Sequence, residues 1–129
     1  MKTEPQKNRP KFLNLFKIKQ PLPAQISILH RISGVLLFFP GIPLLLYGLH
    51  LSLASPESFA GLQAMMNNPL VKCALLLPVW LFMHHLCAGI RHLALDVHLG
   101  VSLEHARFSS KLVLFMGGFL TILVGVWLW

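Results

Sequence analysis

The sequence predicts an all-α membrane protein with three transmembrane helices. Of its 129 residues, 55% are hydrophobic and 12% are charged, and the mean hydropathy is +0.67. This composition is typical of integral membrane proteins. The apolar residues gather in long segments without the period-two alternation of β-strands. Each segment reaches the about 20 residues with which a helix crosses about 30 Å of hydrocarbon, at about 1.5 Å per residue.

The chain divides into a basic N-terminal segment, residues 1–26, and a single membrane domain, residues 27–129. We expect the helices of the membrane domain at about 27–54, 69–96 and 110–129. Prolines inside these helices predict kinks and not breaks, because neighbouring helices in a membrane can satisfy the carbonyl groups that a proline leaves unpaired.

The distribution of basic residues predicts the orientation in the membrane. Six of them precede the first helix: Lys2, Lys7, Arg9, Lys11, Lys17 and Lys19. The loop 55–68 has no Lys or Arg, whereas the loop 97–109 contains Arg107. By the positive-inside rule, we expect the N-terminus and the second loop on the cytoplasmic side, and the first loop and the C-terminus across the membrane. We expect this membrane to be a bacterial inner membrane.

Composition and motifs also limit the partners and the chemistry of this chain. A basic tail next to a membrane helix is typically attracted to anionic membrane lipid. No module that reads bases accompanies it, so we expect no nucleic-acid partner. Cys73 and Cys87 are too far apart on one helix to bridge. A C-x-x-C-H motif for covalent haem attachment is missing, and so is any catalytic constellation of a self-contained enzyme.

The second helix ends with HHLCAGIRHLALD, residues 84–96, which holds an unusual number of ionisable groups for a membrane segment. At about 100° per residue, one stripe of this helix carries His85, Gly89, His92 and Asp96. His84 and Arg91 form a second stripe about 100° away. Such groups cost at least about 2.5 kcal/mol each at membrane depth, so a functional site is the first hypothesis for them.

His85 is the candidate ligand of a haem iron. It lies about 16 Å deeper in the membrane than Asp96, and a neutral imidazole binds iron well. Gly89, one turn away, leaves a notch in which a flat porphyrin can approach the backbone. The alternative is a histidine that hydrogen-bonds to another helix, as polar residues in membrane bundles often do.

A second axial histidine would have to lie at the depth of His85. His30 is expected too near the cytoplasmic edge, and His50 too near the opposite edge. The third helix has no histidine. We therefore expect the second ligand, if it is a histidine, on another polypeptide.

The start of the first helix, SILHRISG at residues 27–34, is the other concentration of polar residues. Ser27 and Arg31 share a face, and His30 lies about 60° to the side. One interpretation is a serine at the helix N-terminus with an arginine that extends to the membrane surface. In the other, His30 and Arg31 bind haem propionates, and the Ser27 hydroxyl binds a quinone carbonyl.

These motifs carry a family resemblance. RP at residues 9–10, SILHRISG, and HLCAGIRHLALD from His85, in three helices, resemble the cytochrome b556 subunits of succinate dehydrogenase, respiratory complex II. The resemblance implies that this chain is half of a heterodimeric haem-binding helix bundle. It matches His85 to the axial ligand of the haem b iron, and Ser27 and Arg31 to residues of the ubiquinone pocket.

The resemblance also implies the remaining site residues and the partners. His30 and Arg31 match the pair that contacts the haem propionates, and His92 lies near the same haem edge. His84 does not fit the motif spacing and is assigned no iron. A second hydrophobic anchor subunit would supply the other haem ligand, and an iron–sulfur subunit and a flavoprotein subunit would complete the complex. Succinate would be oxidised on other subunits, so this chain has no catalytic residue of its own and serves electron transfer.

Three alternatives remain open. A quinol:fumarate reductase anchor would run the reaction backwards, although the haem-less anchors of that class have no need of His85. A cytochrome b subunit of a hydrogenase or a formate dehydrogenase normally binds two haems, which takes more histidines in mid-membrane than this chain has. A small transporter or a purely structural helix bundle is the third, but the internal repeats typical of transporters are not apparent.

Overall fold

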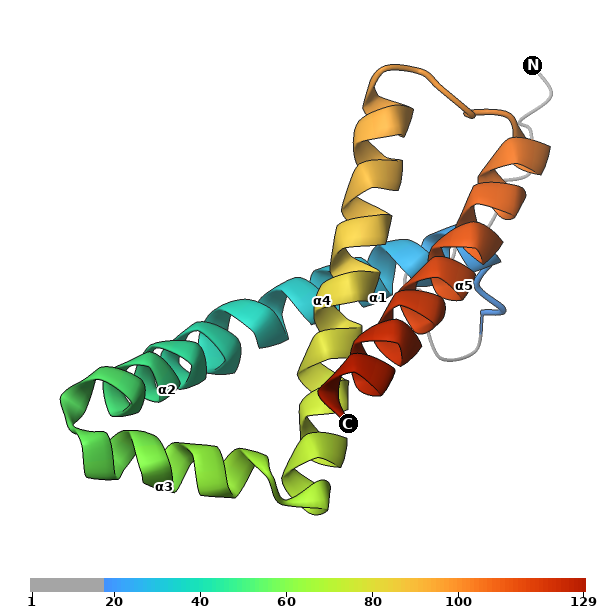
Figure 1. The fold of residues 1–129 in the computed structure, drawn as a ribbon. Coiled ribbons are helices and arrows are strands. Elements are labelled where there is room, and N and C mark those ends of the chain that lie inside the picture. The colour runs from blue at the N-terminus through green and yellow to red at the C-terminus, as the bar shows by residue number, and fades with distance from the viewer. Residues whose placement is uncertain (1–17) are drawn as a thin grey trace, which may run out of the picture.

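The computed structural model describes residues 18–129, which form helices and turns and no strand (Figure 1). The elements are α1 (Leu22–Leu36), the π-helical segment η1 (Leu37–Gly41), α2 (Ile42–Ala54), α3 (Pro56–Met66), α4 (Pro69–Asp96) and α5 (Leu103–Leu128). Because α1, η1 and α2 run on as one span, three helices within residues 18–129 are long and apolar enough to cross a membrane. The predicted all-α membrane fold is confirmed. Most of the basic N-terminal segment, residues 1–17, lies outside the described residues.

Two of the three spans begin earlier than expected, while α4 occupies the expected range. The first span starts at Leu22 instead of about residue 27, directly after Pro21, so its first turn belongs to the segment assigned to the basic tail. The third starts at Leu103 instead of about residue 110. Ser102 caps it, since its hydroxyl oxygen accepts the backbone N–H of His105 at 3.4 Å, and this cap starts the helix within a polar stretch.

Proline changes the first span without ending it, as predicted. Pro40 has no N–H to donate, and its ring crowds the carbonyl of Leu36 one turn earlier. The helix widens into the π-helical turn η1 at this point. A Cβ at Gly41 would lie 3.3 Å from the Leu36 oxygen, so a glycine next to the proline leaves room for the displaced carbonyl. Pro78 is likewise contained in the unbroken helix α4.

The connection between the first two spans is itself helical. Ser55 caps α3 by accepting the backbone N–H of Ser58 at 3.1 Å, and the Ser58 hydroxyl donates to the Leu51 carbonyl of α2 at 2.7 Å. The backbone N–H of Glu57 and the Ser55 hydroxyl lower the pKa of the exposed Glu57 carboxyl. These bonds fold α3 back along α2 toward the start of α4 (Figure 1).

Helices α4 and α5 form a close antiparallel pair. Their contacts follow one register: Lys72 with Leu128, Leu76 with Gly125, His84 with Gly117, and Arg91 with Ser109. At the middle of the pair, a Cβ at Gly117 would lie only 3.4 Å from the His84 Cα. Small residues at such crossings let membrane helices approach closely, which favours their association through van der Waals contacts.

We expect Gly117→Leu to destabilise the α4–α5 pair, because the added side chain would push against the His84 backbone. Overpacking of this kind typically costs about 1–3 kcal/mol. The measurement is the fraction of the chain that stays soluble when detergent extracts are heated. Gly118→Leu is the matched control, since a Cβ at Gly118 would meet nothing within 4 Å. Equal heat sensitivity of the two variants would contradict the proposed role of Gly117.

The first span crosses α4 and then runs away from it (Figure 1). Ile26 of α1, Ala88 of α4 and Val113 of α5 form a small buried core beside the crossing, but α2 has no buried residue. Large apolar side chains beyond the crossing are exposed: Phe38 by 62%, Phe39 by 68% and Leu45 by 73%. Exposing such a large apolar surface to water would be energetically unfavourable, so it faces lipid or other membrane chains.

Candidate functional site

Three histidines meet where the first span crosses α4. The ring of His30 on α1 is stacked on that of His85 on α4, with 4.1 Å between centroids and 13° between planes. The ring of His30 also lies near that of His92 on α4, with 5.0 Å between centroids and 48° between planes. The structure therefore brings together the three histidines that the sequence placed around a haem.

Two glycines make the crossing close enough for this cluster. A Cβ at Gly34 of α1 would lie 3.0 Å from Cε1 of His85, so a side chain at this position would force the ring to shift. A Cβ at Gly89 of α4 would lie 3.5 Å from Nε2 of His30. Each helix thus offers a notch to an imidazole of the other.

The His85 ring is held through one of its nitrogens. Nδ1 lies 3.1 Å from the carbonyl oxygen of His30 and 3.1 Å from Oγ of Ser33. Among the described residues, Nε2 has no hydrogen-bond partner. Metal-binding histidines commonly bond in this way, with one nitrogen held by the protein and the other left for the metal.

The depth expected for His30 is wrong. It was expected nearer the cytoplasmic edge than His85, yet the two rings touch. The reason is the oblique crossing of the first span over α4 (Figure 1), because counting residues along parallel axes misplaces residues on crossed helices. The stack still differs from an axial pair. Two axial ligands approach iron from opposite sides, whereas these rings lie face to face, and so the second ligand on another chain stays a prediction.

Ser27 and Arg31 lie one turn apart on α1. Ser27 is half-buried and Arg31 is exposed, and neither side chain has a hydrogen-bond partner among the described residues. The helix begins at Leu22 with Pro21 at the cap position, so the interpretation of Ser27 as a helix N-cap is wrong. Both polar groups remain available to a ligand.

The second polar stripe of α4 faces α5 and not the histidine cluster. His84 is 1% exposed, lies over the Trp80 ring at 5.6 Å, and has no partner for either ring nitrogen within the described chain. The Arg91 Nε donates to the Ser109 hydroxyl at 3.0 Å, and its side chain is buried. Arg91 is therefore held between α4 and α5.

Ser33 is the site residue that the sequence did not point to. It is 1% exposed and touches the ring of His85, 52 positions further along the chain. The only signal in the sequence was its place next to Gly34, three residues after His30. A serine in an apolar helix most often bonds to its own backbone, so only the crossing of the helices reveals the contact.

These features define a helical membrane protein with an imidazole cluster between two spans. Comparison with known proteins narrows this class. Residues 5–124 match the family of succinate dehydrogenase/fumarate reductase transmembrane subunits, and the chain belongs to this family.

Curated relatives agree with the family match. The chain is 41% identical over 122 residues to a succinate dehydrogenase cytochrome b556 subunit of Coxiella burnetii, covering 94% of this chain and 97% of the relative. It is 36% identical over 104 residues to the subunit of that name from Paracoccus denitrificans, covering 81% and 79%. With that of Rickettsia bellii it shares 32% over 127 residues, covering 97% of both. The family resemblance seen in the two motifs is confirmed.

Proposed function

We propose that this chain is the cytochrome b membrane anchor of a succinate dehydrogenase, and that it binds haem b through His85. The observation that carries the proposal is the His85 ring, in a chain of the succinate dehydrogenase transmembrane family. The ring is held at Nδ1 by α1, and its Nε2 has no partner among residues 18–129. The names of the curated relatives support the direction of succinate oxidation over fumarate reduction.

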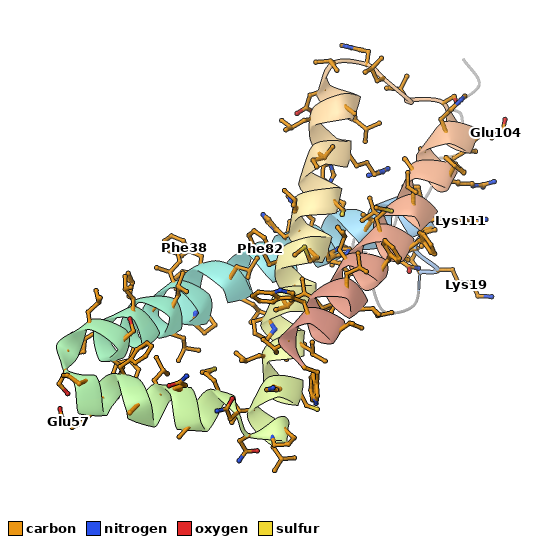
Figure 2. The ribbon with its side chains drawn as sticks, viewed as in Figure 1. Lys19, Phe38, Glu57, Phe82, Glu104 and Lys111 are labelled. Atoms are coloured by element: carbon orange, nitrogen blue, oxygen red, sulfur yellow. The ribbon has the colours of Figure 1, made fainter. Side chains whose placement is uncertain are left out.

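The residues around His85 fit one side of a haem. The imidazoles of His85 and His30 fill the notches at Gly34 and Gly89, so a porphyrin would not enter the notch expected at Gly89. The exposed Phe38 of η1 and Phe82 of α4, both labelled in Figure 2, supply apolar surface for it nearby. When bound, haem b supplies a one-electron centre. His85 would bind its iron from one side, and a histidine of the second anchor subunit from the other.

The polar residues near the crossing fit the charged edge of such a haem. Propionates are carboxylates and need donors or cations when they lie in a membrane. His30 lies against His85, and His92 lies against His30, while Arg31 follows His30 on α1. We assign His30, Arg31 and His92 to the propionate side.

Ser27 and Arg31 support a quinone site at the start of α1, which would be completed by the iron–sulfur subunit and the second anchor. The Ser27 hydroxyl would donate to a carbonyl oxygen of ubiquinone. Arg31 would stabilise the negative charge that develops on the quinone as electrons arrive, as preorganised cationic groups do. Two electrons from succinate and two protons convert the quinone to quinol, while the flavoprotein subunit oxidises succinate.

Basic residues support the proposed orientation in a bacterial inner membrane. Lys19, just before α1, and Lys111, in the first turns of α5, lie at the same end of the molecule, whereas Glu57 of α3 lies at the opposite end (Figure 2). By the positive-inside rule, the end with Lys19 and Lys111 faces the cytoplasm. The quinone site would then lie on the cytoplasmic side.

Extraction of the tagged chain in mild detergent tests the proposed assembly. We expect a flavoprotein, an iron–sulfur protein and a second small hydrophobic chain to purify with it. A reduced-minus-oxidised spectrum of the product should show a b-type band, and succinate should reduce ubiquinone faster than quinol reduces fumarate. A chain that purifies alone without a haem band would point to a transporter or structural bundle and overturn the proposal.

A further inference from the structure

The hydroxyl of Ser33 lies between the backbone of α1 and the ring of His85. Ser33 Oγ donates to the His30 carbonyl at 2.9 Å and lies 3.1 Å from Nδ1 of His85. The same carbonyl lies 3.1 Å from the same Nδ1. Three polar atoms thus form a closed triangle, with Ser33 almost completely buried.

These contacts assign the proton of the imidazole. A carbonyl oxygen can only accept, so the short distance from the His30 oxygen to Nδ1 requires a proton on Nδ1. The hydroxyl proton of Ser33 is already directed to that carbonyl, and its oxygen is left to accept from Nδ1 as well. In a neutral imidazole with its proton on Nδ1, Nε2 carries the lone pair that a metal needs.

We propose that Ser33 is a positioning residue that accepts a second hydrogen bond from Nδ1 of His85 and thereby lowers the redox potential of the haem. This inference rests on the proposed function, in which His85 is the axial ligand. A hydrogen bond from Nδ1 to an oxygen makes Nε2 a stronger base. A more basic ligand stabilises ferric iron more than ferrous iron, and the potential falls.

Position and burial make Ser33 suited to this role. Gly34 next to it brings the α1 backbone against the ring, since a Cβ added at Gly34 would lie 3.0 Å from Cε1 of His85. Water has little access to a side chain that is 1% exposed, so no solvent molecule replaces the hydroxyl if it is removed. An unreplaced hydrogen bond in a medium of low polarity has a larger effect than one at a surface.

The test is a redox titration of the haem in the assembled complex with Ser33→Ala. We expect the midpoint potential to rise, with a threefold to tenfold weaker preference for ferric iron; tenfold corresponds to about 59 mV for a one-electron couple. The haem content should stay unchanged, because the His30 carbonyl still holds the ring. Ser33→Thr, which keeps a hydroxyl, should restore the original potential.

Two further variants make the test specific. Ser110→Ala is the matched control, because Ser110 is 0% exposed in a membrane helix and its hydroxyl donates to the Ala106 carbonyl, away from the cluster. Its haem potential should equal that of the unchanged complex. Ser33→Cys preserves the size of the side chain with a much weaker hydrogen-bonding group, and should shift the potential as alanine does even where the alanine variant fails to assemble.

The failure of this inference differs from the failure of the proposed function. If His85→Leu removes the haem but neither Ser33→Ala nor Ser33→Cys moves the potential, the role of Ser33 is refuted and the haem ligand stands. If His85→Leu keeps an unchanged haem, the proposed function falls and this inference falls with it. A shift of the same size in Ser110→Ala would show a general packing effect and also refute the role of Ser33.

Discussion

Replacing His85 with leucine is expected to remove the b-type haem band from the purified complex. Leucine has a similar bulk but no lone pair for iron, so the haem would lose the ligand that this chain provides. The measurement is the reduced-minus-oxidised spectrum per mole of complex, together with extraction of haem. We expect at least a tenfold loss of haem, because replacing even the residues that hydrogen-bond to a metal ligand typically costs about 10–100-fold in affinity.

A control variant at the neighbouring His84 and a rescue experiment make this prediction specific. His84→Phe is the matched control, because His84 faces α5 and its ring lies over Trp80, a contact that phenylalanine can also make. Its haem band should persist. In His85→Gly, added imidazole should restore the band by filling the place of the lost ring, even if the leucine variant assembles poorly. A full haem band in His85→Leu, or its loss in His84→Phe alone, would show that the ligand was assigned to the wrong histidine.

The stripes of α4 could be predicted from the sequence because they depend only on the period of a helix. His85 lies on one face of α4, and His84 and Arg91 lie on another, as their spacing indicated, although only the structure shows that the first face meets α1 and the second meets α5. Long apolar segments likewise predicted all three spans, since the thickness of the bilayer fixes the length of a helix that crosses it. Both inferences use properties of a single helix.

What could not be predicted depends on how two helices meet. The contact of His30 with His85 follows from the oblique crossing at Gly34 and Gly89, and the sequence contains no direct measure of a crossing angle. The Ser33 contact was missed for the same reason. The early start of α5 could have been predicted, because Ser102 with Glu104 in the following turn is a visible capping signal. It was missed because the expected start was placed by the apolar residues alone.

Quinone reduction is expected to fall by about 10²-fold in the double variant Ser27→Ala, Arg31→Ala, the effect typical of losing a preorganised donor at a reacting oxygen. The hydroxyl that binds the carbonyl and the cation that stabilises its developing charge would both be gone. Succinate oxidation measured with a soluble dye that takes electrons from the flavoprotein should continue at the original rate, because that reaction bypasses the quinone site. The comparison of the two rates separates quinone chemistry from assembly.

The matched control for this pair is Ser52→Ala, Arg107→Ala. Ser52 is half-buried like Ser27, and its hydroxyl donates to the Leu49 carbonyl of α2, while Arg107 is exposed like Arg31. We expect the control to reduce quinone normally. The single variant Ser27→Ala should keep its haem band, which separates the hydroxyl from any effect of Arg31 on the propionates. Unchanged quinone reduction in the Ser27, Arg31 double variant would place the quinone site elsewhere, and an equal loss in the control pair would show that the effect does not belong to the start of α1.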